Sequence, residues 1–143
     1  MIKKTQAFSS FSVDDIPAAK EFYGDTLGLN VTEKPEGLQL EIGGLKVFLY
    51  AKDDHEAASF TVLNFPVDDV EKTVDELTDL GVTFEQYEGE LETDEKGIFH
   101  GGEGKGGGPD KIAWFTDPAG NIISVVDGAF EAEDKKKSSA AKV

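Results

Sequence analysis

The chain has 143 residues, which is enough for one compact domain with its own core. Its 29 acidic side chains outnumber 14 lysines, and there is no arginine, so the net charge of -15 makes nucleic acid a poor partner. The absence of cysteine excludes disulfides, thiolate metal ligands and a cysteine nucleophile. No apolar run approaches the roughly 18 residues of a membrane span. We therefore expect a cytoplasmic protein with no membrane partner.

The first half of the chain predicts a strand, a helix and three further strands. A run rich in strand formers covers 5–13, and apolar residues then recur at helical spacing from Ile16 to Leu27, where Gly28 ends the helix. Three alternating runs follow, at 29–34, 37–42 and 45–50. Gly43 and Gly44 separate the last two runs, which is the pattern of a two-residue hairpin turn.

The second half repeats this order at an offset of 54 residues, which aligns Asp15 with Asp69. A strand is predicted over 58–67 and a helix over 69–80, ended by Gly81. The remaining strands are predicted at 82–87, 111–116 and 121–126, with the turn Asp117-Pro118-Ala119-Gly120 between the last two. We define two modules, 5–51 and 59–127, inside a single domain at 1–128. A polar tail covers 129–143.

The paired aspartates Asp14-Asp15 and Asp68-Asp69 open the two predicted helices. They could be paired catalytic carboxylates, but their presence at both equivalent helix starts favours capping of the first backbone N–H groups. The second module is also longer than the first. Its additional residues form an acidic and glycine-rich loop near 88–110, and a loop of this length is often a lid or a binding loop.

Each module would be a sheet with a helix on one face only. Two such modules can bury their sheets by placing them edge to edge around a cavity. The predicted fold class is therefore α+β, with two tandem βαβββ modules whose curved mixed sheet encloses a cavity.

The stretches VDDIPAAKEFYGDTLGL, residues 13–29, and AWFTDPAGNIISVV, residues 113–126, resemble the start and end signatures of the vicinal oxygen chelate superfamily. This group holds glyoxalases, bleomycin-resistance proteins and extradiol dioxygenases. The resemblance covers roughly residues 5–127 and implies the same fold. It is weak evidence for function, because this fold hosts several unrelated activities.

The resemblance also implies where a divalent metal would be held. Enzymes of the superfamily use four His, Gln or Glu side chains from the first and last strands of each module, and the matching positions here are Phe8, Phe48, Val62 and Ser124. Zinc, nickel or iron require imidazole nitrogen or carboxylate oxygen, which these side chains lack. Shifting each strand by two residues in either direction produces no metal site. We expect neither a metal nor another cofactor.

A cavity with an apolar floor and a few polar groups is typical of a small-molecule pocket. Phe8 and Phe48, which replace metal ligands, are the expected stacking faces. His100 is expected to contact the ligand from the 88–110 loop, or else to belong to a plain flexible loop, whereas His55 is expected to be exposed in the linker between the modules. The expected ligand-binding residues are Phe8, Ser10, Phe48, Tyr50, Val62, Asn64, His100, Trp114 and Ser124.

Three functions remain open at this point. The first is a metal-free protein that binds a small aromatic or cationic molecule, as bleomycin-resistance proteins do, with the charge of -15 raising the local concentration of a cation. The second is a lyase, isomerase or dioxygenase-like enzyme with a non-standard site that uses His100, Glu41 or another group. The third is a structural or regulatory protein whose cavity is filled by its own side chains. The resemblance also implies a homodimer.

Overall fold

The computed structural model describes residue 2, residues 6–101 and residues 110–127. Two compact units can be distinguished, one formed by 1–59 with 117–121 and the other by 60–116 with 122–143. The predicted tail at 129–143 and the glycines of 102–109 lie outside the described residues. Within the described part of the chain, no helix is long and apolar enough to cross a membrane.

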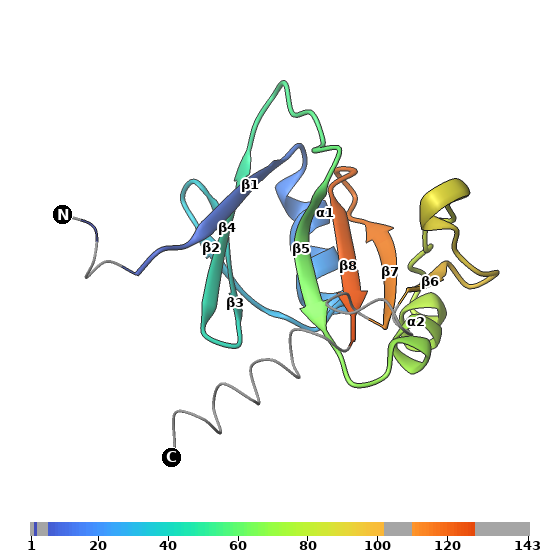
Figure 1. Ribbon diagram of the computed structural model, residues 1–143. Helices are drawn as coiled ribbons and strands as arrows, with labels where there is room; N and C mark the ends of the chain where they lie inside the picture. The colour runs from blue at the N-terminus through green and yellow to red at the C-terminus, as the bar shows by residue number, and fades with distance from the viewer. Residues whose placement is uncertain (1, 3–5, 102–109, 128–143) are drawn as a thin grey trace, which may run out of the picture. The chain divides into compact units, whose positions relative to one another are not determined.

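The first unit contains one four-stranded mixed sheet with a helix against it (Figure 1). Strand β1 is parallel to β4, while β2 and β4 both run antiparallel to β3, so the strand order is β1-β4-β3-β2. The elements are β1 (Ser9–Val13), α1 (Ile16–Lys20), η1 (Glu21–Thr26), β2 (Asn30–Lys34), β3 (Gly37–Ile42) and β4 (Leu45–Ala51).

The helix begins at Asp15, whose side chain accepts a hydrogen bond from the backbone N of Ala18 at 3.0 Å. This confirms the capping role predicted for the aspartate pair. Helix α1 continues directly into η1, a π-helical turn in which the N–H of Leu27 donates to the carbonyl of Phe22. Gly28 then adopts a φ of 74°, which ends the helix as predicted.

The two faces of the first sheet differ in burial. On β3 and β4 the residues that face the helix are fully buried, and those between them are only partly buried. The buried hydrophobic side chains of this unit are Val13, Ala19, Tyr23, Leu38, Leu40, Val47 and Leu49. The opposite face, which we call the open face, carries Ser10, Gln39, Phe48 and Tyr50.

The second unit repeats the arrangement of the first (Figure 1). Its strand order is β5-β8-β7-β6, with β5 parallel to β8, and the Asp69 side chain caps α2 by accepting from the N–H of Lys72 at 3.0 Å. The repeat predicted from the sequence is confirmed. The elements are β5 (Thr61–Pro66), α2 (Val70–Asp79), η2 (Gly89–Leu91), β6 (Ile98–His100), β7 (Lys111–Thr116) and β8 (Ile122–Val126).

The strand predicted over 82–87 is wrong, because the chain forms only one bridge there, between Phe84 and Phe115. The N–H of Glu85 then donates to the carbonyl of Trp114, and regular pairing stops until β6, apart from one bridge between Thr93 and Phe99. Gly97 closes this excursion with a φ of 87°, and a Cβ atom there would lie 2.8 Å from the carbonyl oxygen of Glu85. One edge strand is therefore interrupted by the segment 85–97, which we call the excursion.

A buried polar cluster in the first unit surrounds Asp117. The hydroxyl of Tyr23 donates to Asp117 Oδ2 at 2.6 Å, and Asp117 Oδ1 accepts from the backbone N–H groups of Ala119 and Asn121. The Asn121 amide nitrogen donates to Asp117 Oδ2 and to the carbonyl of Ser12. The turn 117–120 is thus predicted correctly, but its side-chain partners come from segments far away in the sequence.

His55 is half-buried, so the prediction of an exposed linker residue is wrong. Its Nε2 lies 2.9 Å from the carbonyl oxygen of Ala119, which can only accept, so Nε2 carries the proton. In the neutral ring Nδ1 then accepts from the hydroxyl of Ser12 at 2.6 Å. Both hydrogen bonds stay within the first unit, and they fix the linker to β1 and to the 117–121 turn.

Candidate functional site

The open face of the first sheet holds a pocket of about 240 Å³. Two aromatic rings and two polar side chains dominate its lining, which consists of Phe8, Gln39, Lys46, Val47 and Phe48. All five residues belong to the first unit. Four of these residues lie on β3 and β4, and the fifth, Phe8, directly precedes β1.

The strand register explains why these side chains meet. Phe48 lies opposite Ser10 of β1 and opposite Gln39 of β3, and residues that are partners in a ladder share a face. Lys46 precedes Phe48 by two residues on β4 and therefore points to the same side. Phe8 directly precedes β1 and is 64 % exposed, so its ring can reach a ligand without displacing a core contact.

The two polar residues of the lining were not among the expected site residues. No hydrogen bond joins the Gln39 side chain, and no ion pair joins Lys46, to any residue within the described ranges. Gln39 could have been found by counting strand partners outward from the Gly43-Gly44 turn, and Lys46 from its spacing to Phe48. The pairing of β3 with β4 across this turn thus contained the information needed to place both residues at the pocket.

Ser10 and Tyr50 share the open face with Phe48 but do not line the pocket. Ser10 is exposed and pairs with Phe48 across the ladder, and Tyr50 is half-buried and pairs with Ser12. Both lie beside the pocket, where a ligand larger than its volume would meet them. The structure therefore brings Phe8 and Phe48 together in one pocket and places Ser10 and Tyr50 next to it.

The remaining expected residues lie in the second unit. Asn64, Ser124 and Trp114 form one row across β5, β8 and β7, and the fully buried Ser124 hydroxyl donates to Asn64 Oδ1 at 2.5 Å. Val62 is half-buried where the register between β5 and β8 shifts, so it has no partner in the ladder. The hydroxyl of Ser124 is thus already engaged within the protein.

Trp114 is 9 % exposed because other rings of the second unit cover it. The Tyr87 ring meets it edge-on at 5.4 Å between centroids, and the Phe99 ring lies 6.3 Å away. Burial, followed by the charge of Glu85, raises the pKa of the Tyr87 phenol. The rings of Tyr87 and Phe99 therefore pack against Trp114, whereas the rings of Phe8 and Phe48 border the pocket.

His100 ends strand β6 rather than lying in a loop, which corrects the expectation for it. The ring lies on the opposite side of β6 from Phe99, which contacts Trp114, and its Nε2 lies 2.8 Å from Asp94 Oδ2. Burial raises the pKa of Asp94, but hydrogen bonds from His100 and from the N–H groups of Ile98 and Lys96 outweigh this and lower it. The contact between His100 and Asp94 therefore links the end of β6 to the excursion.

The four positions at which the superfamily resemblance places metal ligands do not fit a metal. Phe8, Phe48 and Val62 have no donor atom, and the Ser124 hydroxyl donates to Asn64. Among the described ranges, no group of three or more His, Asp or Glu side chains could hold a metal ion.

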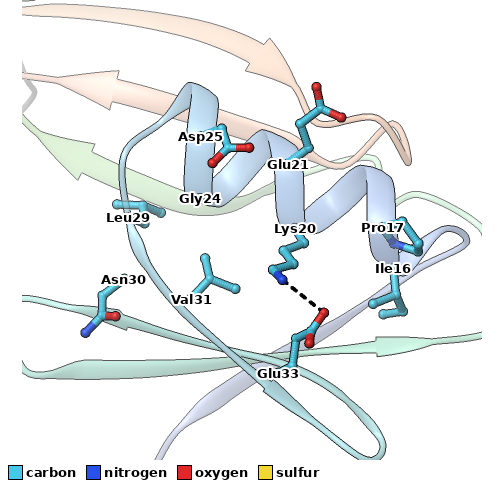
Figure 2. A pocket seen from close by; sticks show the side chains of 10 residues that line it. All are labelled: Ile16, Pro17, Lys20, Glu21, Gly24, Asp25, Leu29, Asn30, Val31 and Glu33. Atoms are coloured by element: carbon cyan, nitrogen blue, oxygen red, sulfur yellow. Dashed lines mark ion pairs between the residues drawn. The ribbon is translucent and has the colours of Figure 1, made fainter.

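A second hollow of about 650 Å³ lies between the helix of the first unit and β2 (Figure 2). Figure 2 shows Lys20 on the helix reaching toward Glu33 on β2, and their ion pair spans the groove at 3.1 Å. The walls carry further acidic groups, Glu21 and Asp25. Because its cation is already paired and no aromatic side chain lines it, this groove is a weaker candidate than the pocket at Phe48.

Comparison with solved structures supports the fold. A glyoxalase family protein from Enterococcus faecalis matches with a TM-score of 0.61 and 21% identity, over 88% of this chain and 99% of that one. A fosfomycin resistance protein from Listeria monocytogenes matches with a TM-score of 0.63 and 14% identity, over 92% and 98%. A lactoylglutathione lyase from Agrobacterium tumefaciens matches with a TM-score of 0.58 and 21% identity, over 87% and 94%.

Identities this low show a shared fold and leave the activity open. The comparison with curated proteins finds no match. The family model for the Glyoxalase/Bleomycin resistance protein/Dioxygenase superfamily matches residues 6–125, which is most of the chain. The chain therefore belongs to the Glyoxalase/Bleomycin resistance protein/Dioxygenase superfamily.

Proposed function

We propose that this protein binds a small aromatic molecule in the pocket between Phe8 and Phe48. The observation that carries the proposal is the lining itself, in which two aromatic rings and two polar side chains without partners in the described ranges surround about 240 Å³. Apolar walls with a few polar groups that orient a guest are typical of small-molecule sites. The rings stand where the resemblance would place metal ligands, so a binding surface replaces a metal centre.

The size of the pocket limits the ligand. An apolar cavity of roughly 150 Å³ is enough for benzene. The 240 Å³ here suits one aromatic ring with a short polar substituent, and a larger compound would extend over Ser10 and Tyr50. A flat ring gains most from this site, because it can stack on Phe48 while its edge meets the Phe8 ring.

Family membership is compatible with binding proteins and with enzymes. The description of the superfamily names bleomycin resistance proteins beside glyoxalases and dioxygenases, and the structural relatives include a fosfomycin resistance protein and a lactoylglutathione lyase. We favour binding because His100 is held by Asp94, and the described residues that line the pocket include no carboxylate and no imidazole that could act as an acid–base pair. The proposal keeps the homodimer and the cytoplasmic location expected from the sequence.

The proposal is tested by ligand-induced stabilisation with benzamide, a neutral single-ring compound. A ligand at about 100 times its dissociation constant should add roughly 2.7 kcal/mol to the free energy of unfolding. Changing Phe48→Ala should abolish most of this gain by removing a stacking face. Phe60→Ala is the matched control, because Phe60 is 68 % exposed and does not line the pocket.

The result expected is a higher melting temperature with benzamide for the wild type and for the Phe60 variant, and little change for the Phe48 variant. Circular dichroism of each variant without ligand would establish that it is folded. The proposal would be overturned if neither benzamide nor any compound of a wider single-ring set stabilised the wild type. Equal stabilisation of the wild type and a double variant, Phe8→Ala with Phe48→Ala, would overturn it as well.

A further inference from the structure

We propose that the pocket selects an aromatic molecule that carries a negative charge, such as an aromatic carboxylate, over a neutral or cationic one. This inference rests on the proposed function and specifies its ligand class. The expectation of a cationic ligand came from the net charge of the whole chain. The charge at the pocket itself has the opposite sign.

Lys46 is the only charged residue among the five that line the pocket. Its ammonium group has no carboxylate within 4.0 Å among the described residues, although Glu41 is its partner in the β3–β4 ladder. Four other lysines form ion pairs, for example Lys20 with Glu33 and Lys52 with Asp54, while Lys34 and Lys72 resemble Lys46 in having none among the described residues. A cation beside an aromatic pocket with no ion pair of its own can receive the anionic group of a ligand.

Gln39 adds a neutral donor on the same face. Its side-chain amide has two N–H donors, and it lies opposite Phe48 in the ladder. A carboxylate on a ring stacked against Phe48 could accept from Lys46 and from Gln39 together. A cationic substituent would instead face the ammonium of Lys46, which disfavours it.

The acidic surface of the rest of the molecule opposes an anion at long range. At physiological ionic strength the screening length is about 8 Å, so distant carboxylates contribute little while a direct contact with Lys46 persists. Glu41 is nearer, as the ladder partner of Lys46, but it forms no ion pair with it and does not line the pocket. The preference is therefore expected at about 0.15 M salt. Because Lys46 is exposed, the preference for the anionic ligand should be modest, about two- to fivefold in dissociation constant.

The experiment compares three compounds of nearly the same shape, benzoate, benzamide and benzamidine, which are anionic, neutral and cationic at pH 7. Their dissociation constants would be measured by NMR titration of the full chain at 0.15 M salt. The wild type should bind benzoate about two- to fivefold more tightly than benzamide and should bind benzamidine most weakly. Lys46→Gln should bring benzoate and benzamide to equal affinity.

Lys52→Gln is the matched control, because it removes an exposed lysine outside the pocket and should preserve the preference. Equal binding of benzoate and benzamide by the wild type would overturn this inference and leave the proposed function intact, as would tighter binding of benzamidine. A preference for benzoate that survives in the Lys46 variant would also overturn it. Failure of all three compounds to bind would overturn both the inference and the proposed function.

Discussion

The two modules share one order of strands and helices, but they differ in the turn before the last strand and in the edge strand of the sheet. In the first module Gly43 and Gly44 form the turn between β3 and β4. Glycine adopts their φ angles of 53° and 89° readily, so no side-chain hydrogen bond is needed to hold this turn. In the second, the corresponding turn is held by the buried carboxylate of Asp117. The edge strand is continuous as β2 in the first module and interrupted by the excursion in the second.

The comparison shows which parts of the repeat are constrained. Helix caps and strand order are preserved in both modules, because each needs an amphipathic helix on one face of a mixed sheet. Turn chemistry and the edge strand can change without disturbing that packing. The aromatic residues have also diverged, since the rings on the open face of the first sheet border a pocket, whereas the rings around Trp114 on the second sheet pack against each other.

The largest predicted effect concerns the turn that depends on a side chain. Asp117→Ala would leave the Tyr23 hydroxyl, two backbone N–H groups and the Asn121 amide without their buried acceptor. The free energy of unfolding should fall by about 3–5 kcal/mol, as expected when one partner of a buried charged group is removed. Urea denaturation measures this loss.

Asp15→Ala is the control for Asp117→Ala, since it removes an exposed cap and should cost about 1 kcal/mol. If both variants lose the same stability, the carboxylate of Asp117 is not what holds this turn.

The next effect concerns the excursion. Gly97→Ala places a Cβ 2.8 Å from the carbonyl oxygen of Glu85 and 2.9 Å from Phe84 Cβ, in addition to the strain of a positive φ. The expected loss is about 2–4 kcal/mol, the sum of backbone strain and overpacking. Gly81→Ala has a similar φ but no atom within 4 Å, and should lose about 1–2 kcal/mol. Chemical denaturation of both variants compares them, and equal losses would contradict the tight closure of the excursion.

The smallest effect appears at alkaline pH. Burial, followed by the charge of Asp117 and their hydrogen bond, raises the pKa of Tyr23 far above its ordinary value of 10.0. The neutral phenol is therefore favoured in the folded state, so its contribution to stability is complete below pH 10 and is lost as the pH rises further, because the unfolded tyrosine ionises.

The difference in unfolding free energy between the wild type and Tyr23→Phe should shrink by about 1.4 kcal/mol per pH unit above pH 10. Denaturation at pH 9, 10 and 11 provides the test. A difference that does not change over this range would mean that the Tyr23 phenol is no harder to ionise in the folded protein than in the unfolded chain.

Much of the backbone could be predicted from the sequence, because its signals are local. The capping positions of Asp15 and Asp69, the stops at Gly28 and Gly81 and the Gly43-Gly44 turn all follow from residue types at fixed spacings, and the structure has each of them. The strand predicted over 82–87 does not form, because pairing there is limited to a single bridge at Phe84.

The polar contacts were harder to predict. In the sequence His55 lies in a polar linker, and its partners Ser12 and Ala119 are 43 and 64 residues away. Such pairings depend on tertiary structure and leave no periodic pattern. The pocket was half predictable, since Phe8 and Phe48 followed from the resemblance while Gln39 and Lys46 needed the register of two strands.

The most direct test of the account maps where an aromatic ligand binds, because each module offers an aromatic face. Benzamide would be titrated into ¹⁵N-labelled protein, with the side-chain amide of Gln39 and the indole N–H of Trp114 as reporters of the two faces. The account predicts that the largest shifts occur at Gln39 and the backbone amides of Lys46, Val47 and Phe48, with Trp114 unchanged. Shifts that centre on Trp114 while Gln39 stays unchanged would contradict it.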